Sequence, residues 1–230
     1  MRADITTIPV AEVFERRDGC PICRMRDILE DRVTEYITGA AMMEPDVRIE
    51  TNREGFCHPH FQKMLAKRNR LSVALILESH LVQVERDVFA GLPLVGKKPA
   101  SQGRSAEKSA GTCFVCDKID WAMERQLATV CRLYAEQREF RQLFAEQPSF
   151  CLPHLSELTA LAGGMDKRYG PEMAAAAARI SRMYLQSLAG DVTHFTKMFD
   201  YRNSGPDADW GNSRDAIERA VGYLTGRDAL

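Results

Sequence analysis

Two short motifs carry most of the metal-binding and nucleophilic chemistry in this 230-residue chain, and each occurs twice. In both halves a CxxC motif comes first and a CxxH motif follows it. A shift of 93 residues relates the two CxxC motifs, and a shift of 94 relates the two CxxH motifs. This register indicates an internal duplication with one inserted residue. The eight residues are Cys20, Cys23, Cys57, His60, Cys113, Cys116, Cys151 and His154.

Each half of the duplicated pattern supplies enough ligands for one metal ion. A CxxC turn directs two thiolates to a common point, and CxxH at a helix start adds a thiolate and an imidazole on one helix face. We therefore expect one Cys3His site from the first CxxC with the first CxxH, and another from the second pair. Because four protein ligands close a tetrahedral shell, the pattern is typical of two structural Zn²⁺ ions rather than catalytic ones.

Other chemistry for the same residues can be weighed from their neighbours. An iron–sulfur cluster is the main alternative, since cysteine and histidine together can hold one. Haem attachment needs CxxCH, but Arg24 and Asp117 follow the two CxxC motifs. His58 aligns with Leu152, which cannot bind a metal, so His58 is not expected to be a ligand. Cys131 is left over and is expected to be a buried free thiol.

Helices must position these ligands, because apolar residues recur at helical spacing after each CxxC motif. In the first half, Met43–Gly55 contains turn-compatible residues and predicts a short loop before Cys57. A helix is predicted from about Pro59 to about Ala90. The second half repeats this scheme, with an interruption at Gly163-Gly164 and a long helix over residues 171–199.

The fold class predicted is all-α, with two pseudo-repeated helical hairpin units that each hold a Cys3His site. The boundaries expected are 1–92 for the first repeat and 112–200 for the second. Residues 93–111 are rich in Gly, Ser, Lys and Pro and predict a flexible linker. Residues 201–230 predict a tail with one short helix from about Ser213.

Composition narrows the class of protein further. Apolar residues make up 45% and charged residues 27%, which is ordinary for a globular protein. The formal net charge of −1 disfavours nucleic acid as a partner. We find no secretory signal and no apolar run long enough to span a membrane. A cytoplasmic location with reduced thiols is therefore expected, and a disulfide framework is disfavoured.

The chain resembles an uncharacterised bacterial family of cytoplasmic proteins with duplicated CxxC and CxxH motifs. The stretches that carry the resemblance are GCPIC at 19–23, GFCHPHF at 55–61, CFVC at 113–116, FCLPHL at 150–155 and FDYRNS at 199–204. The resemblance implies a helical, cytoplasmic, metal-binding protein, with the same eight residues as ligands.

The functional expectation is a zinc-binding, non-enzymatic interaction or regulatory module with a protein partner. No nucleophile–base pair or phosphate-binding loop stands out in the sequence. Two alternatives stay open: an iron–sulfur redox or sensor protein that uses the same eight ligands, and an enzyme whose site lies between the two halves.

Overall fold

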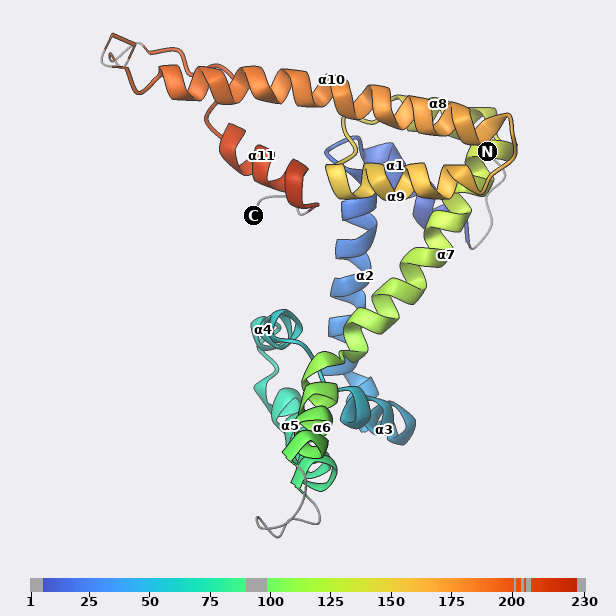
Figure 1. The fold of residues 1–230 in the computed structure, drawn as a ribbon, viewed down its shortest axis with the longest axis vertical. Helices are drawn as coiled ribbons and strands as arrows, with labels where there is room; N and C mark the ends of the chain where they lie inside the picture. The colour runs from blue at the N-terminus through green and yellow to red at the C-terminus, as the bar shows by residue number, and fades with distance from the viewer. Residues whose placement is uncertain (1–5, 90–98, 201, 204, 206–207, 227–230) are drawn as a thin grey trace. The chain divides into compact units, whose positions relative to one another are not determined.

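The computed structural model describes residues 6–89, 99–200, 202–203, 205 and 208–226. These residues form helices and no strand, which confirms the all-α fold (Figure 1). In chain order the elements are α1 (Ile8–Arg16), α2 (Pro21–Thr38), the 3-10 turn η1 (Ala40–Met43), α3 (Pro45–Glu54), α4 (His58–Ala66), α5 (Arg70–Val84), the π-helical turn η2 (Glu85–Phe89), α6 (Pro99–Gly111), α7 (Phe114–Glu136), α8 (Arg138–Ala145), α9 (Leu152–Gly163), α10 (Tyr169–Lys197) and α11 (Ala216–Thr225).

The chain forms two compact units that do not follow sequence order. The first unit combines residues 1–27 with residues 123–230, and the second comprises residues 28–122. Helices α2 and α7 each begin in one unit and end in the other. The units therefore differ from the sequence-order ranges 1–92 and 112–200.

An aromatic cluster forms the core of the first unit. Phe14 of α1 lies 5.0 Å from Phe140 of α8, measured between ring centroids, and Phe144 lies 4.8 Å from Phe150. All four rings are fully buried. Phe150 immediately precedes Cys151, and the Ser181 hydroxyl of α10 donates a 2.7 Å hydrogen bond to its carbonyl oxygen. The core thereby fixes the segment that leads into the second CxxH motif.

In the second unit, α3 packs against α5, and a polar network joins them. Arg48 donates a 2.7 Å hydrogen bond to the Ser79 hydroxyl, which in turn donates to the side-chain oxygen of Asn52 at 2.8 Å. His80 Nδ1 lies 2.9 Å from the carbonyl oxygen of Asn52. These contacts hold the end of α3 directly before the first CxxH motif.

The prediction of a loop over Met43–Gly55 is wrong, because residues 45–54 form α3. Pro45 occupies the first turn of α3, and Gly55 ends the helix with a φ of 62°. Proline at the start and glycine just beyond the end are helix-boundary signals as well as turn signals. The same two residues therefore fit a short helix equally well.

The single helix expected from Pro59 to Ala90 is also wrong. It breaks after α4, where Arg68 adopts a left-handed φ of 61°. Asn69 then caps α5, since its side-chain oxygen accepts a hydrogen bond from the Ser72 amide.

The expected linker at 93–111 is helical where the structure describes it, because residues 99–111 form α6. Residues 93–98 lie outside the described part of the chain. In the tail, the predicted short helix is present as α11 and begins at Ala216 rather than Ser213.

Candidate metal centres

The eight cysteine and histidine residues gather in two groups of four, but the motifs exchange partners. The first CxxC joins the second CxxH, which we call the α2–α9 site: Cys20, Cys23, Cys151 and His154. The second CxxC joins the first CxxH, which we call the α4–α7 site: Cys57, His60, Cys113 and Cys116. Within each site one ligand atom per residue lies within 4.8 Å of all the others. The expected grouping by sequence order is therefore wrong, although each unit still contains one Cys3His group.

The α2–α9 site is buried in the first unit. His154 Nδ1 lies 3.5 Å from Cys20 Sγ, 3.3 Å from Cys23 Sγ and 3.0 Å from Cys151 Sγ. Cys23 Sγ and Cys151 Sγ are 3.6 Å apart. All three cysteines are at most 3% exposed. Three sulfurs and one nitrogen thus converge on a single point without intervening side chains.

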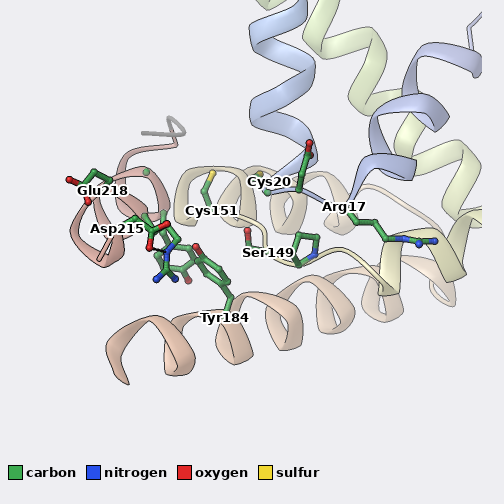
Figure 2. A pocket seen from close by; sticks show the side chains of 13 residues that line it. Arg17, Cys20, Ser149, Cys151, Tyr184, Asp215 and Glu218 are labelled. Carbon is green, nitrogen blue, oxygen red and sulfur yellow. Dashed lines mark hydrogen bonds and ion pairs between the residues drawn. The ribbon is translucent and has the colours of Figure 1, made fainter. Parts of the chain in front are cut away.

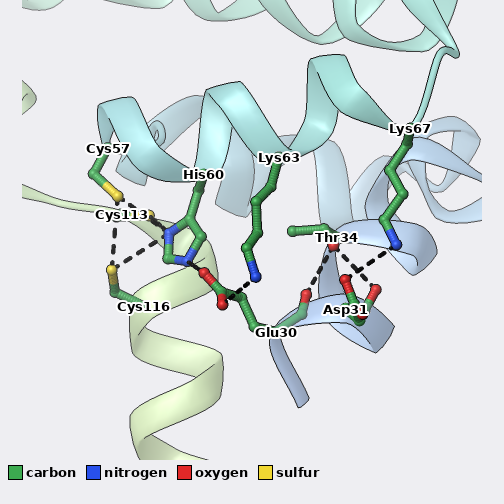
Figure 3. Close-up of polar contacts among 9 residues, drawn as sticks. All are labelled: Glu30, Asp31, Thr34, Cys57, His60, Lys63, Lys67, Cys113 and Cys116. Carbon is green, nitrogen blue, oxygen red and sulfur yellow. Dashed lines mark hydrogen bonds and ion pairs between the residues drawn. The ribbon is translucent and has the colours of Figure 1, made fainter. Parts of the chain in front are cut away.

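The α4–α7 site has the same composition in the second unit (Figure 3). His60 Nδ1 lies 3.1 Å from both Cys57 Sγ and Cys113 Sγ, and 3.5 Å from Cys116 Sγ. Cys57 Sγ and Cys116 Sγ are 3.9 Å apart. His60 and Cys113 are buried, whereas Cys57 and Cys116 are only partly buried.

Both sites lie where two helices begin. Cys151 and Cys57 are the residues that cap α9 and α4, each followed two positions later by proline in the first turn. Cys20 and Cys113 directly precede α2 and α7. Helix N-termini carry unpaired N–H groups and a partial positive charge, which favours the thiolate form of a nearby cysteine. The helix starts therefore supply the geometry of a thiolate cluster, although burial raises the pKa of the Cys116 thiol to about 12.

Backbone contacts join the two chain segments at the α4–α7 site. The Phe114 amide donates a 3.0 Å hydrogen bond to the Gly55 carbonyl, and the Thr112 hydroxyl donates to the Glu54 carbonyl at 2.7 Å. A Cβ atom on Gly55 would lie 2.8 Å from the His80 imidazole. Glycine is therefore required here both by its positive φ and by the close approach of His80.

A carboxylate contacts the histidine of the α4–α7 site at the ring nitrogen that faces away from the sulfurs. Glu30 of α2 places Oε1 2.9 Å from His60 Nε2, and its other oxygen pairs with Lys63 of α4 (Figure 3). Nε2–H is donated to Glu30, so Nδ1 is the ring nitrogen that faces the three sulfurs. Carboxylates in this position orient metal-binding histidines and raise their basicity.

Ionisation in the α4–α7 site reflects these contacts. The hydrogen bond from His60, followed by the Lys63 ammonium, lowers the pKa of Glu30 to about 2. The hydrogen bond to Cys113, followed by that to Glu30, raises the pKa of His60 to about 10. Burial is the largest influence on Cys113 and opposes its ionisation, but the hydrogen bonds with His60, Cys116 and Cys57 together outweigh burial and bring the thiol pKa to about 6. A thiolate beside an imidazolium is therefore the favoured pair before a cation enters.

The repeated sequence pattern does not include this carboxylate. The shift of 93 residues places Met123 of α7 at the position that corresponds to Glu30 of α2. Met123 is buried and apolar. The two Cys3His groups therefore have the same ligand types but differ in the residues that surround those ligands.

A pocket of about 480 Å³ borders the α2–α9 site and is lined by residues of α10, α11 and the segments before α2 and α9 (Figure 2). Cys20 and Cys151 lie at its edge. Tyr184 and Tyr223 contribute two rings whose centroids are 5.6 Å apart. Arg219 on its wall is held by carboxylates on either side, at 2.9 and 3.0 Å.

Two further charged residues that line the pocket are also engaged in ion pairs. Asp18 pairs with Arg24 at 2.5 Å, and Arg17 pairs with Glu146. Neighbouring side chains thus neutralise most of the charge around the pocket. The charge of the pocket wall therefore does not indicate which kind of ligand would bind there.

The C-terminal end of α11 closes another side of the α2–α9 site. The carbonyl oxygen of Gly226 lies 3.2 Å from Cys23 Sγ. Gly226 has a φ of 77°, and a Cβ atom there would lie 3.2 Å from Cγ of Pro153 and 3.6 Å from Cys151 Sγ. Neither this contact nor the role of Glu30 can be predicted from motif spacing, because each joins a ligand to a segment distant in sequence.

The two residues set aside in the sequence lie outside both groups. His58 is exposed in the first turn of α4 and is absent from both Cys3His groups. Cys131 lies in α7 and is partly buried rather than fully buried, and burial raises the pKa of its thiol.

The fold and the ligand sets define an all-α protein with two Cys3His groups, each assembled from distant parts of the chain. A family model described as a family of unknown function (DUF6062) matches residues 1–229, and the chain belongs to this family. No curated protein and no solved structure matches the chain. Among the described helices, none combines the length and the apolar character needed to cross a membrane.

Proposed function

We propose that the protein binds two zinc ions, one in each Cys3His group, and that both sites serve a structural role in a non-enzymatic interaction or regulatory module. The convergence of four soft or borderline ligands at each site carries this proposal. An ion about 2.3 Å from each sulfur, at tetrahedral angles, separates two thiolates by about 3.8 Å. The Sγ–Sγ distances of 3.6 and 3.9 Å fit this separation.

The compactness of the ligand sets favours a single ion over a cluster. In an iron–sulfur cluster the ligands bind different iron atoms, so their donor atoms are spread farther apart than around one ion. Here all four ligand atoms of each set lie within 4.8 Å of one another. A filled set of four also leaves no open coordination position for a substrate, which supports a structural role.

Exposed apolar residues on α11 support the interaction role. Ile217, Val221 and Leu224 follow one another at helical spacing and are 47%, 53% and 56% exposed. Such a stripe on one face of a helix is suited to contact with another protein. We propose that the module operates in the cytoplasm, where its six site thiols stay reduced.

Metal analysis and absorbance of freshly purified protein test the metal assignment. A colourless protein with two equivalents of zinc supports it. Broad visible absorption with bound iron and inorganic sulfide contradicts it and favours the iron–sulfur alternative.

The interaction role is tested separately by affinity capture with the wild-type chain and with an Ile217→Ser, Val221→Ser, Leu224→Ser variant. A protein captured by the first and lost from the second supports the role of α11. Equal capture by both contradicts it, provided that circular dichroism shows the same helix content.

A further inference from the structure

The two Cys3His groups differ in how far their sulfurs are shielded. In the α2–α9 site Cys20 and Cys151 are each 3% exposed and Cys23 is 2% exposed, even though the pocket reaches the edge of the site. In the α4–α7 site Cys57 and Cys116 are only partly buried. Oxidation of cysteine depends on thiolate character and on access by the oxidant. The α4–α7 site therefore contains the less buried cysteines.

The two less buried cysteines of the α4–α7 site, Cys57 and Cys116, are also neighbours. Cys57 Sγ and Cys116 Sγ lie 3.9 Å apart, at the starts of α4 and α7. A disulfide requires about 2.05 Å between sulfurs, so the two sulfurs must approach each other by about 1.9 Å for the bond to form. Cys113, the third sulfur of the site, is 5% exposed and lies against His60. Access thus selects Cys57 and Cys116 as the reacting pair, and their sulfurs are already neighbours.

We propose that the α4–α7 site is a redox-sensitive metal site, in which a hydroperoxide oxidises Cys57 and Cys116 to a disulfide and the bound ion is released. This inference rests on the proposed function, because it requires that the site holds zinc. It assigns different roles to two sites of identical ligand composition: the α2–α9 site is permanent, and the α4–α7 site responds to oxidant.

The chemistry balances with hydrogen peroxide as the oxidant. One thiolate attacks a peroxide oxygen, the O–O bond breaks, and a sulfenic acid and hydroxide form. The second thiolate then attacks the sulfenic sulfur, which forms the S–S bond and expels a second hydroxide. Two electrons pass from the sulfurs to the peroxide, and two protons from solvent convert the hydroxides to water.

Loss of these two thiolates leaves only Cys113 and His60 as protein ligands. Two of four ligands cannot close a tetrahedral shell, so the ion dissociates. The new bond would join residues 59 positions apart and keep the starts of α4 and α7 together after the ion leaves. Thiol–disulfide exchange with a small dithiol, which is itself oxidised to a disulfide, returns Cys57 and Cys116 to thiols and restores the four-ligand set, so the change is reversible.

The test uses the full chain loaded with zinc, with Cys131→Ser to remove the seventh thiol. Hydrogen peroxide is added, released zinc is followed with a coloured chelator, and disulfides are located by peptide mass mapping. One equivalent should leave at least about tenfold faster than the other, because access by the oxidant controls the rate. The fast phase of zinc release should coincide with the formation of a disulfide between the peptides that contain Cys57 and Cys116.

A Cys116→His variant provides the matched control, because it keeps a zinc ligand and removes an oxidisable sulfur. It should retain two equivalents of zinc and lose the fast phase. A corresponding Cys23→His variant in the α2–α9 site should retain the fast phase. Both variants replace a thiolate ligand by an imidazole, but only Cys116→His removes a sulfur of the reacting pair. Comparison of the two shows whether the fast phase depends on that pair or only on the type of ligand.

Equal release rates for both ions overturn the proposal, as does a first disulfide within the α2–α9 site or between Cys113 and Cys116. Each of these results would leave the proposed function standing, because zinc would have been present at the start. Protein that carries no zinc before peroxide is added would instead contradict the proposed function itself.

Discussion

Cys23 and His154 are 131 residues apart in sequence, yet Cys23 Sγ and His154 Nδ1 lie 3.3 Å from each other. The same exchange brings His60 within 3.1 Å of Cys113. Each Cys3His group therefore ties a segment from one half of the chain to a segment from the other. Because each ion would close a long loop in the chain, its binding should contribute strongly to stability.

Removal of the metal should destabilise the protein substantially. Structural zinc contributes about 10–16 kcal/mol of binding free energy in small peptides, and part of this becomes folding free energy. Treatment with a strong chelator should lower the melting temperature and reduce the helix signal in circular dichroism. Added zinc should restore both. An unchanged melting curve after complete metal removal would contradict a structural role for the ions.

Glu30 should strengthen metal binding at the α4–α7 site alone. Glu30→Gln removes the charge that faces His60 Nε2, and loss of such a partner weakens metal affinity by about 10–100-fold. Competition with a chelator of known affinity measures the effect. Asp31→Asn is the matched control, because Asp31 forms only an exposed pair with Lys67 at 3.3 Å. Equal affinities for the two variants would refute the role of Glu30.

The effect of Glu30→Gln should not depend on pH across the neutral range. The contacts with His60 and Lys63 lower the pKa of Glu30 from 4.5 to about 2. For a lowered carboxyl pKa, the stabilisation is present above the unfolded value and is lost only as the pH falls through the folded value. The ratio of wild-type to variant affinity should therefore stay constant between about pH 5 and pH 8. A ratio that decreases steadily as the pH is lowered from 8 to 5 would show that Glu30 titrates within this interval.

Gly226→Ala should disturb the α2–α9 site and leave the α4–α7 site unchanged. The substitution forces a side chain onto a φ of 77° and places Cβ 3.2 Å from Pro153. Strain of this kind costs about 1 kcal/mol or more. We expect a lower melting temperature and faster loss of one equivalent of zinc to a chelator.

Gly190→Ala is the control for Gly226→Ala. Gly190 lies within α10, and a Cβ atom there would meet nothing within 4 Å. Alanine favours a helix interior over glycine by about 0.5–1 kcal/mol, so this variant should be as stable as the wild type or slightly more stable. Similar losses of stability in both variants would contradict a specific role for Gly226.

The sequence was sufficient to predict the all-α fold and the eight residues that gather in the two groups. Motif spacing carries this information, because CxxC and CxxH each bring two donors together locally. It carries no information on which CxxC meets which CxxH. That choice depends on the lengths and packing of the intervening helices.

Helix α2 contributes residues to both sites, because its first turn holds Cys23 and its middle holds Glu30. Its 18 residues span about 27 Å. Contacts with Glu30 and Asp31 hold α4 against α2. Glu30 lies seven residues beyond Cys23, which corresponds to about 10 Å along the helix axis. His60 therefore contacts Glu30 within the second unit, whereas Cys23 belongs to the first unit.

Metal content of paired cysteine variants tests the exchanged pairing most directly. Cys20→Ser with Cys151→Ser places both changes in the α2–α9 site, so this protein should retain one equivalent of zinc after dialysis against a weak chelator. Cys20→Ser with Cys57→Ser damages both sites and should retain none. The opposite pattern, with one equivalent kept by the second protein and none by the first, would show that the motifs pair in sequence order.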